Sequence, residues 1–209
     1  MKFDSLIFDM DGTLWDAVDS YVAVWNKTFE SMGYSVSVSR DDLLRYMGKP
    51  LDEIVESIAS FLPSGRTGEF YDRLARYDSE MMPVLGGRLY PGVAEWFPRL
   101  AERYAVYMVS NCGPDGLRNF LTFTGLAEYV TDTLTNGETH LPKSGNIALL
   151  ALRNGFKSPV YIGDTQGDCD QAHIAGIPMA HVTYGFGECR DADYSFSDFE
   201  SLARFLLEK

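Results

Sequence analysis

The chain has 209 residues, 45% of them hydrophobic and 23% charged, which is the balance of a globular protein and excludes extensive disorder. Its formal net charge of −12 disfavours nucleic acid and anionic membranes as partners, because phosphate backbones are bound through surplus Lys and Arg. No stretch has the length and apolarity of a membrane span or a signal region, and the three cysteines follow no ligand pattern, so we expect reduced thiols and a cytoplasmic protein.

The N-terminal part predicts one strand followed by helices. Residues 5–8 are an apolar run that stops at carboxylates, as a buried parallel strand does at the edge of its sheet. Helical spacing of apolar residues then marks four segments: 18–32, which Gly33 ends, one that begins after Ser39, 51–61 and 70–81. Residues 16–82 are therefore expected to be helical, without a strand.

The pattern changes after residues 83–92, a segment rich in Gly and Pro that predicts a hinge. Beyond it, apolar runs that predict strands alternate with helical patterns. The expected strands are 105–109, 129–133, 159–162 and 178–182, and the expected helices are 93–103, 117–125, 144–154, 168–175 and 198–207. Such alternation indicates a parallel sheet that is covered by helices on both faces.

We therefore expect an α/β protein in two parts. A Rossmann-like parallel sheet core comprises residues 1–15 and 86–209, and an inserted all-helical domain comprises residues 16–85. Open α/β sheets bind their ligands at the carboxyl ends of the strands. An insertion directly after the first strand would therefore form a roof over such a site.

Two carboxylates, Asp9 and Asp11, directly follow the first strand. Acids this close are costly unless a cation neutralises them, although such a pair taken alone is most often a solvated or capping cluster. A calcium loop beginning at Asp9 would need a Gly at its sixth position and a Glu at its twelfth. The chain has Leu14 and Ser20 there, so the calcium interpretation fails.

Further polar residues follow later strands. Asp164 and Asp168 come after one expected strand, and Ser110 and Asn111 come at the end of another. Because parallel strand ends converge on one edge, the acids can share a divalent ion with hard oxygen ligands, and the hydroxyl and amide can hold phosphate oxygens. Lys143, taken alone, would be a solvated surface lysine.

Four ordered segments resemble the motifs of the haloacid dehalogenase superfamily of hydrolases: FDMDGTLWD at 8–16, VSN at 109–111, Lys143, and GDTQGD at 163–168. The first of them is the most specific, and the lysine alone would be weak. The resemblance spans essentially the whole chain. Residues 16–82 resemble the helical cap of the branch that contains phosphoglycolate phosphatases and β-phosphoglucomutase-like proteins.

The resemblance implies roles for four aspartates. Asp9 would be the nucleophile that forms an aspartyl-phosphate, and Asp11 would protonate the leaving oxygen and then activate water. A carboxylate nucleophile makes a mixed anhydride that water can cleave, and the second acid supplies and removes the proton. The resemblance also implies a Mg²⁺ ion bound by Asp9, the backbone carbonyl of Asp11, and Asp164, with Asp168 supporting the site.

The same resemblance implies a phosphate-binding set. Ser110 and Lys143 would hold and neutralise the equatorial phosphate oxygens, where charge accumulates in the transition state. Gly12, Thr13 and Asn111 are expected beside the bound substrate, with Thr13 ordering the loop.

Lys49 lies in the segment Gly48-Lys49-Pro50 between two cap helices. Relatives place a substrate-contacting loop there, so one hypothesis is that Lys49 contacts the leaving group when the cap closes. An exposed loop lysine is nearly as good an interpretation. The Schiff-base chemistry of phosphonatases is disfavoured, because their sequence context around the cap lysine is not matched.

The sequence thus favours a magnesium-dependent phosphatase that acts on a small phosphorylated metabolite of the phosphoglycolate, sugar-phosphate or nucleotide type, as a monomer or weak homodimer. A phosphomutase of the β-phosphoglucomutase type would use the same Asp9 and Asp11 and stays an alternative. A non-catalytic binding protein would be expected to lose Asp9 or Asp164, and both are present. True dehalogenases do not have the second aspartate, so Asp11 puts carbon–halogen chemistry in doubt.

Overall fold

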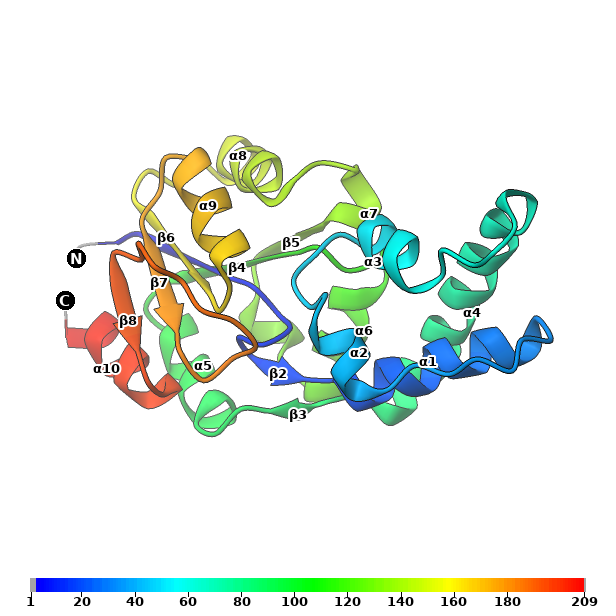
Figure 1. The fold of residues 1–209 in the computed structure, drawn as a ribbon. Coiled ribbons are helices and arrows are strands. Elements are labelled where there is room, and N and C mark those ends of the chain that lie inside the picture. Colours follow the sequence, from blue (N-terminus) through cyan, green and yellow to red (C-terminus); the bar gives the residue numbers. More distant parts are fainter. Residues whose placement is uncertain (1–2, 209) are drawn as a thin grey trace.

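The computed structural model describes residues 3–208, and its largest element is a six-stranded sheet with the order β5-β4-β1-β6-β7-β8 (Figure 1). All neighbouring strands in this sheet are parallel. The strands are β1 (Ser5–Phe8), β4 (Ala105–Ser110), β5 (Asp132–Thr135), β6 (Pro159–Gly163), β7 (Met179–Val182) and β8 (Tyr194–Phe196). This architecture confirms the predicted α/β class with a Rossmann-like parallel sheet.

Helices cover both faces of the sheet, which explains the apolar sequence of residues 6–8 in its central strand. Leu6 and Phe8 of β1 belong to one buried cluster, whereas Ile7 belongs to another on the opposite face. The first cluster includes residues of α5 (Val93–Ala101), α6 (Gly116–Thr124) and α10 (Phe199–Glu208), and the second includes residues of α8 (Lys143–Asn154) and α9 (Gln166–Ile174). Because both faces of β1 are covered, the charged residue next to it, Asp9, lies at the end of the strand.

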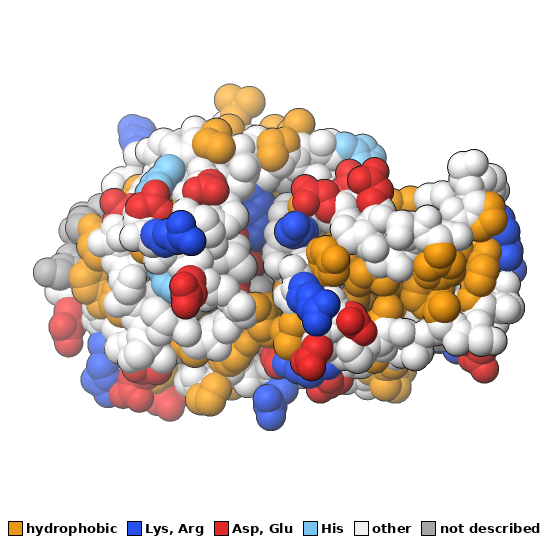
Figure 2. Space-filling model, in the orientation of Figure 1, with side chains coloured by type: hydrophobic (Ala, Val, Ile, Leu, Met, Phe, Trp, Pro, Cys, Tyr) orange, Lys and Arg blue, Asp and Glu red, His pale blue; other side chains and the backbone are white. Residues whose placement is uncertain are grey.

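The segment after β1 forms a helical part that we call the cap. It consists of α1 (Val18–Ser31), α2 (Arg40–Leu44), α3 (Leu51–Ile58), the 3₁₀ turn Ser64–Arg66, and α4 (Thr67–Leu85). Helix α1 packs along α4, with the ring of Phe70 5.4 Å from that of Trp25 and 5.2 Å from that of Phe29. In Figure 2, hydrophobic side chains remain visible between α1 and α3, as is normal for a folded surface.

Two short antiparallel strands join the cap to the rest of the chain. Strand β2 (Trp15–Asp16) leads into the cap and pairs with β3 (Arg88–Leu89), which leads out of it. The expectation that residues 16–82 contain no strand is therefore wrong at Asp16. Helix α4 also continues past Pro83, because that residue is exposed and water can satisfy the carbonyl left without a donor.

The largest error in the predicted elements concerns residues 129–133. Residues Ala127–Tyr129 form a 3₁₀ turn, and β5 begins only at Asp132, which pairs with Tyr107 of β4. The pairing register with β4, rather than local apolar content, decides where this strand starts. The edge strand β8 and the short helix α7 (Asn136–Thr139) were also not predicted. No helix within residues 3–208 is both long and apolar enough to cross a membrane.

Candidate active site

Three adjacent strands, β4, β1 and β6, end together at one edge of the sheet. Asp9 follows β1, Ser110 ends β4, and Asp164 follows β6. All three are buried, with exposed fractions of 2%, 3% and 0%. The structure thus brings together residues from three distant parts of the chain, at the edge where open α/β sheets bind ligands.

A buried cluster of charges lies at this edge. Carboxylate oxygens of Asp9, Asp164 and Asp168 all lie within 4.8 Å of one another. Lys143, the first residue of α8, places its Nζ 2.8 Å from Asp9 Oδ1 and 2.5 Å from Asp168 Oδ1. Lys143 is only 2% exposed, so it is not the solvated lysine that its sequence taken alone suggests.

The electrostatics of the cluster leave negative charge uncompensated. Burial raises the pKa of Asp9 to about 6 despite the attraction of Lys143, and burial together with the charges of Asp168 and Asp9 raises the pKa of Asp164. One lysine thus faces three buried carboxylates. A divalent cation with oxygen ligands fits this set, because it would compensate the remaining charge.

Asp168 differs from the other two acids because its neighbours lower its pKa instead of leaving it raised. Oδ1 lies beside Lys143, whereas Oδ2 accepts hydrogen bonds from the backbone N–H of Asp164 and from the N–H and hydroxyl of Thr165. The contact from the Thr165 N–H, together with the N–H of Asp168 donating to Thr165 Oγ1, forms a capping box at the start of α9. Burial alone would raise the pKa of Asp168, but Lys143 and these donors lower it. Asp168 therefore fixes the position of Lys143 and of the Asp164 loop.

Two glycines, Gly12 and Gly185, pack closely against the side chain of Asp164. A Cβ at Gly12 would lie 2.1 Å from Asp164 Oδ2, and a Cβ at Gly185 would lie 2.3 Å from Asp164 Cβ. Gly12 also has a φ of +82°, a conformation that side chains disfavour. The glycine in the DGT turn is thus required both by its backbone angle and by the space that Asp164 occupies.

Two side chains that the sequence did not single out bind Asp11. Trp15 Nε1 donates to Asp11 Oδ1 at 2.9 Å, and the hydroxyl of Tyr21 donates to both carboxylate oxygens at 3.1 and 3.3 Å. Burial, and next the charge of Asp9, raise the pKa of Asp11 to about 7. Tyr21 belongs to α1, so the cap contributes directly to the environment of this acid.

The loop of residues 184–187, which follows β7, also contacts the site, although no functional role was predicted for it from the sequence. The hydroxyl of Tyr184 donates to the carbonyl of Thr13, and the N–H of Phe186 donates to Asp164 Oδ2 at 2.7 Å. Thr13 in turn donates from its hydroxyl to Asp164 Oδ1 at 3.3 Å. Glycines at 185 and 187 were the only signal that this loop packs tightly.

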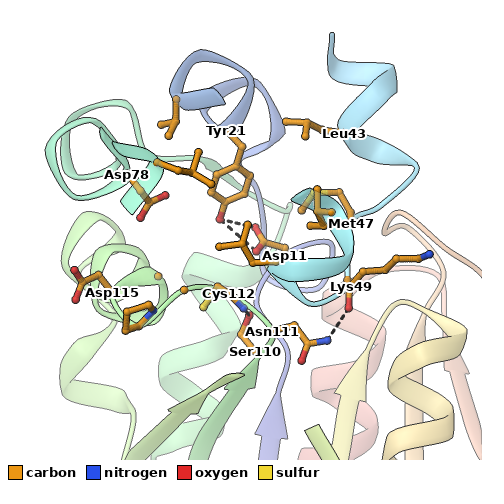
Figure 3. Close-up of a pocket in the computed structure, with 18 of the residues that line it drawn as sticks. Asp11, Tyr21, Leu43, Met47, Lys49, Asp78, Ser110, Asn111, Cys112 and Asp115 are labelled. Carbon is orange, nitrogen blue, oxygen red and sulfur yellow. Dashed lines mark hydrogen bonds between the residues drawn. The ribbon is translucent and has the colours of Figure 1, made fainter. Parts of the chain in front are cut away.

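A cavity of about 170 Å³ opens between this edge and the cap (Figure 3). Asp9, Asp11, Ser110 and Lys143 line it from the core. This volume is below the ~300–1,000 Å³ typical of pockets for drug-sized ligands, so the cavity suits a small molecule.

The remaining predicted residues lie at the boundary of core and cap. Asn111 lines the cavity and donates from Nδ2 to the carbonyl of Gly48 at 2.8 Å, while its Oδ1 is buried without a hydrogen-bond partner. Lys49 also lines the cavity, but its side chain extends away from Asp11 in Figure 3 and its Nζ lies 3.8 Å from Glu53. Asn111 thus joins the cap to the core, and Lys49 is half exposed.

Comparison with known proteins identifies the family. The family model described as haloacid dehalogenase-like hydrolase matches residues 6–182. A phosphoglycolate phosphatase of Rhodobacter capsulatus is 27% identical over 193 residues, covering 87% of this chain and 85% of the relative, and one of Synechococcus elongatus is 26% identical over 189 residues, covering 88% and 85%. A crystal structure described as a predicted phosphoglycolate phosphatase from Haemophilus somnus aligns with a TM-score of 0.86 at 23% identity and covers 98% of each chain.

The chain therefore belongs to the haloacid dehalogenase-like hydrolase family, and it is a phosphatase of that family. This result confirms the resemblance that the four sequence motifs indicated.

Proposed function

We propose that this phosphatase is magnesium-dependent and hydrolyses a small-molecule phosphate monoester through an aspartyl-phosphate on Asp9. One observation carries the proposal: Asp9 lines the cavity while being buried, charge-paired to Lys143 at 2.8 Å, and clustered with Asp164. A carboxylate held in this way is a preorganised nucleophile. The substrate is a small phosphorylated metabolite, and the protein acts as a monomer or weak homodimer.

Asp9, the backbone carbonyl of Asp11, and Asp164 would hold the Mg²⁺ ion. When bound, the ion supplies positive charge that lets an anionic nucleophile approach an anionic phosphate. Ser110 and Lys143 bind the phosphoryl oxygens, where charge builds up in the transition state. The substrate is thereby oriented with its phosphorus toward Asp9 and its alcohol part toward the cap.

The reaction takes place in two steps. A carboxylate oxygen of Asp9 forms a bond to phosphorus as the bond to the leaving oxygen breaks, and Asp11 donates a proton to that oxygen. Asp11 then removes a proton from water, whose oxygen attacks phosphorus and releases Asp9. Burial raises the pKa of Asp11 to about 7, which suits a group that must act both as acid and as base near neutral pH.

The proposal is tested by phosphate release from a panel of sugar phosphates, nucleotides, phosphoglycolate and a generic aryl phosphate. Each ester is assayed with Mg²⁺ and with a chelator. We expect turnover with Mg²⁺ and its loss with the chelator. Absence of phosphate release from every ester would contradict the proposal and favour a phosphomutase, which returns the phosphoryl group to its substrate.

Gly12→Ala is expected to lower kcat/KM by about 100-fold, because the new methyl group forces the Asp164 carboxylate from its position and a 1 Å misplacement can have this effect. Gly33→Ala is the matched control. Its φ of +81° imposes the same backbone strain, but nothing lies within 4 Å of the added Cβ. Thermal unfolding and steady-state kinetics of both variants separate the two effects, and equal activity of the two variants would contradict the explanation.

A further inference from the structure

The cap side of the cavity is largely apolar. The alcohol part of a substrate held at Asp9 must lie against this side, because the core side is occupied by the phosphate-binding groups. The apolar lining residues of the cap include Val24, Trp25, Leu43, Met47, Ile54 and Leu74. Such a wall stabilises a hydrocarbon chain and gives no hydrogen bonds to a polyhydroxylated one.

The cavity offers little positive charge to a second anionic group on the substrate. Among the described residues that line it, the only cationic side chains are Lys49 and Lys143. Lys143 is already paired with Asp9 and Asp168 and lies on the phosphate side. Lys49 extends away from Asp11 in Figure 3 and faces Glu53. A carboxylate on the alcohol part would therefore be desolvated without compensation.

The cavity has carboxylates of its own in the same region. Asp78 of α4 and Asp115 line it, and Figure 3 shows both on the side opposite Lys49. Asp115 is paired with Arg118 at 2.6 Å. Asp78 accepts a long hydrogen bond of 3.4 Å from Asn119, and within residues 3–208 no cationic side chain lies within ion-pair distance of it.

The raised pKa of Asp78 also favours a cationic group in the cavity. Burial, and next the charge of Asp115, raise the pKa of Asp78 to about 6. Its carboxylate is thus held in an environment that disfavours negative charge, and a cation entering the cavity would relieve this. The net charge of −12 adds a long-range preference for less negative substrates.

We infer that the preferred substrate is a phosphate monoester of a short apolar alcohol that carries an ammonium group, and that Asp78 binds this group. The inference rests on the proposed phosphatase function and specifies its substrate class. Asp78 is then a specificity residue that binds the alcohol part and takes no part in breaking the bond to phosphorus. Phosphoglycolate, whose alcohol part carries a carboxylate, is expected to be a poor substrate.

The test compares three esters with a three-carbon alcohol: 3-aminopropyl phosphate, n-propyl phosphate and 2-carboxyethyl phosphate. With the full-length protein and Mg²⁺, we expect kcat/KM for the ammonium ester to exceed that for the propyl ester by about tenfold, the effect of one charge-assisted hydrogen bond. We expect it to exceed that for the carboxylate ester by about 100-fold or more, because a like charge beside Asp78 is costly.

Asp78→Asn is expected to reduce the ratio of kcat/KM between the aminopropyl and propyl esters toward one. Asp72→Asn, the same substitution on an exposed position of the same helix, is the matched control and should retain the ratio. Because the quantity is a ratio within each variant, a general loss of activity does not imitate the expected result. Thermal unfolding of both variants shows whether they are folded.

Each outcome separates the inference from the function on which it rests. Equal or faster hydrolysis of the propyl or the carboxyethyl ester relative to the aminopropyl ester would overturn the inference and leave the phosphatase function intact. A ratio unchanged by Asp78→Asn would overturn the role of Asp78. No hydrolysis of any ester, p-nitrophenyl phosphate included, would overturn the proposed function and the inference together.

Discussion

Asp9→Asn is expected to abolish phosphate release, with a loss of about 10⁴-fold or more in kcat, as for other nucleophiles that form covalent intermediates. An amide cannot form the mixed anhydride with phosphorus that the proposed mechanism requires. The fold should survive, because the variant removes one of three clustered carboxylates and leaves Lys143 paired with Asp168. Steady-state release of phosphate from an aryl phosphate with Mg²⁺ measures the effect.

A second measurement distinguishes a covalent role of Asp9 from a purely metal-binding one. Acid quenching during turnover, followed by mass spectrometry, should detect a phosphoryl group on the wild-type protein and none on Asp9→Asn. The exposed-site variant Asp72→Asn should behave as the wild type in both assays. Retention of a phosphorylated species in Asp9→Asn would contradict the assignment of the nucleophile.

Lys143→Met is expected to destabilise the protein as well as inactivate it. The lysine is buried between Asp9 and Asp168, so its removal leaves carboxylates buried without their cation, at a cost of about 3–5 kcal/mol. For a chain of this size, that loss lowers the melting temperature by roughly 6–20 °C. Catalysis should fall because a cation at the phosphoryl oxygens is lost. Thermal unfolding in a metal-free buffer measures the first effect.

The effect of Mg²⁺ on the melting temperature provides a second test of the role of Lys143. An ion bound by the same carboxylates would replace part of the missing positive charge, so Mg²⁺ should raise the melting temperature of Lys143→Met more than that of the wild type. Lys27→Met is the control, because Lys27 forms an exposed pair with Glu30 that contributes little to stability. A melting temperature of Lys143→Met equal to that of the control would show that the buried ion pairs are not important for stability.

Much of the fold and of the site could be predicted, because strands and the polar residues at their ends are visible in the local sequence. The run 5–8 has no charged residue, since β1 is covered on both faces, and the first residue after it is Asp9. Carboxylates at two strand ends of a parallel sheet must then approach each other, and the structure places Asp9 and Asp164 in one cluster. Whether these residues act as assigned is a matter for the variants above.

Other parts depend on contacts that no local pattern encodes. Tyr21 fits the apolar spacing of α1 equally well with its hydroxyl in solvent, and only the packing of the cap places that hydroxyl on Asp11. The start of β5 follows from its register with β4, and the role of Phe186 follows from a backbone N–H that any residue could supply. The apolar lining of the cavity was not predicted, because the helical pattern does not show which helix face meets a cavity.

The contact between Tyr21 and Asp11 couples the chemistry to the position of the cap. Tyr21 belongs to the cap, Asp11 belongs to the core, and the hydrogen bond from Asn111 to the carbonyl of Gly48 joins the same two parts. A movement of the cap that carries Tyr21 away from the core would therefore separate Asp11 from one of its donors. In the proposed mechanism, Asp11 would then have its full set of hydrogen-bond donors only with the cap in the position described here, which would favour reaction after the cap has closed over the substrate.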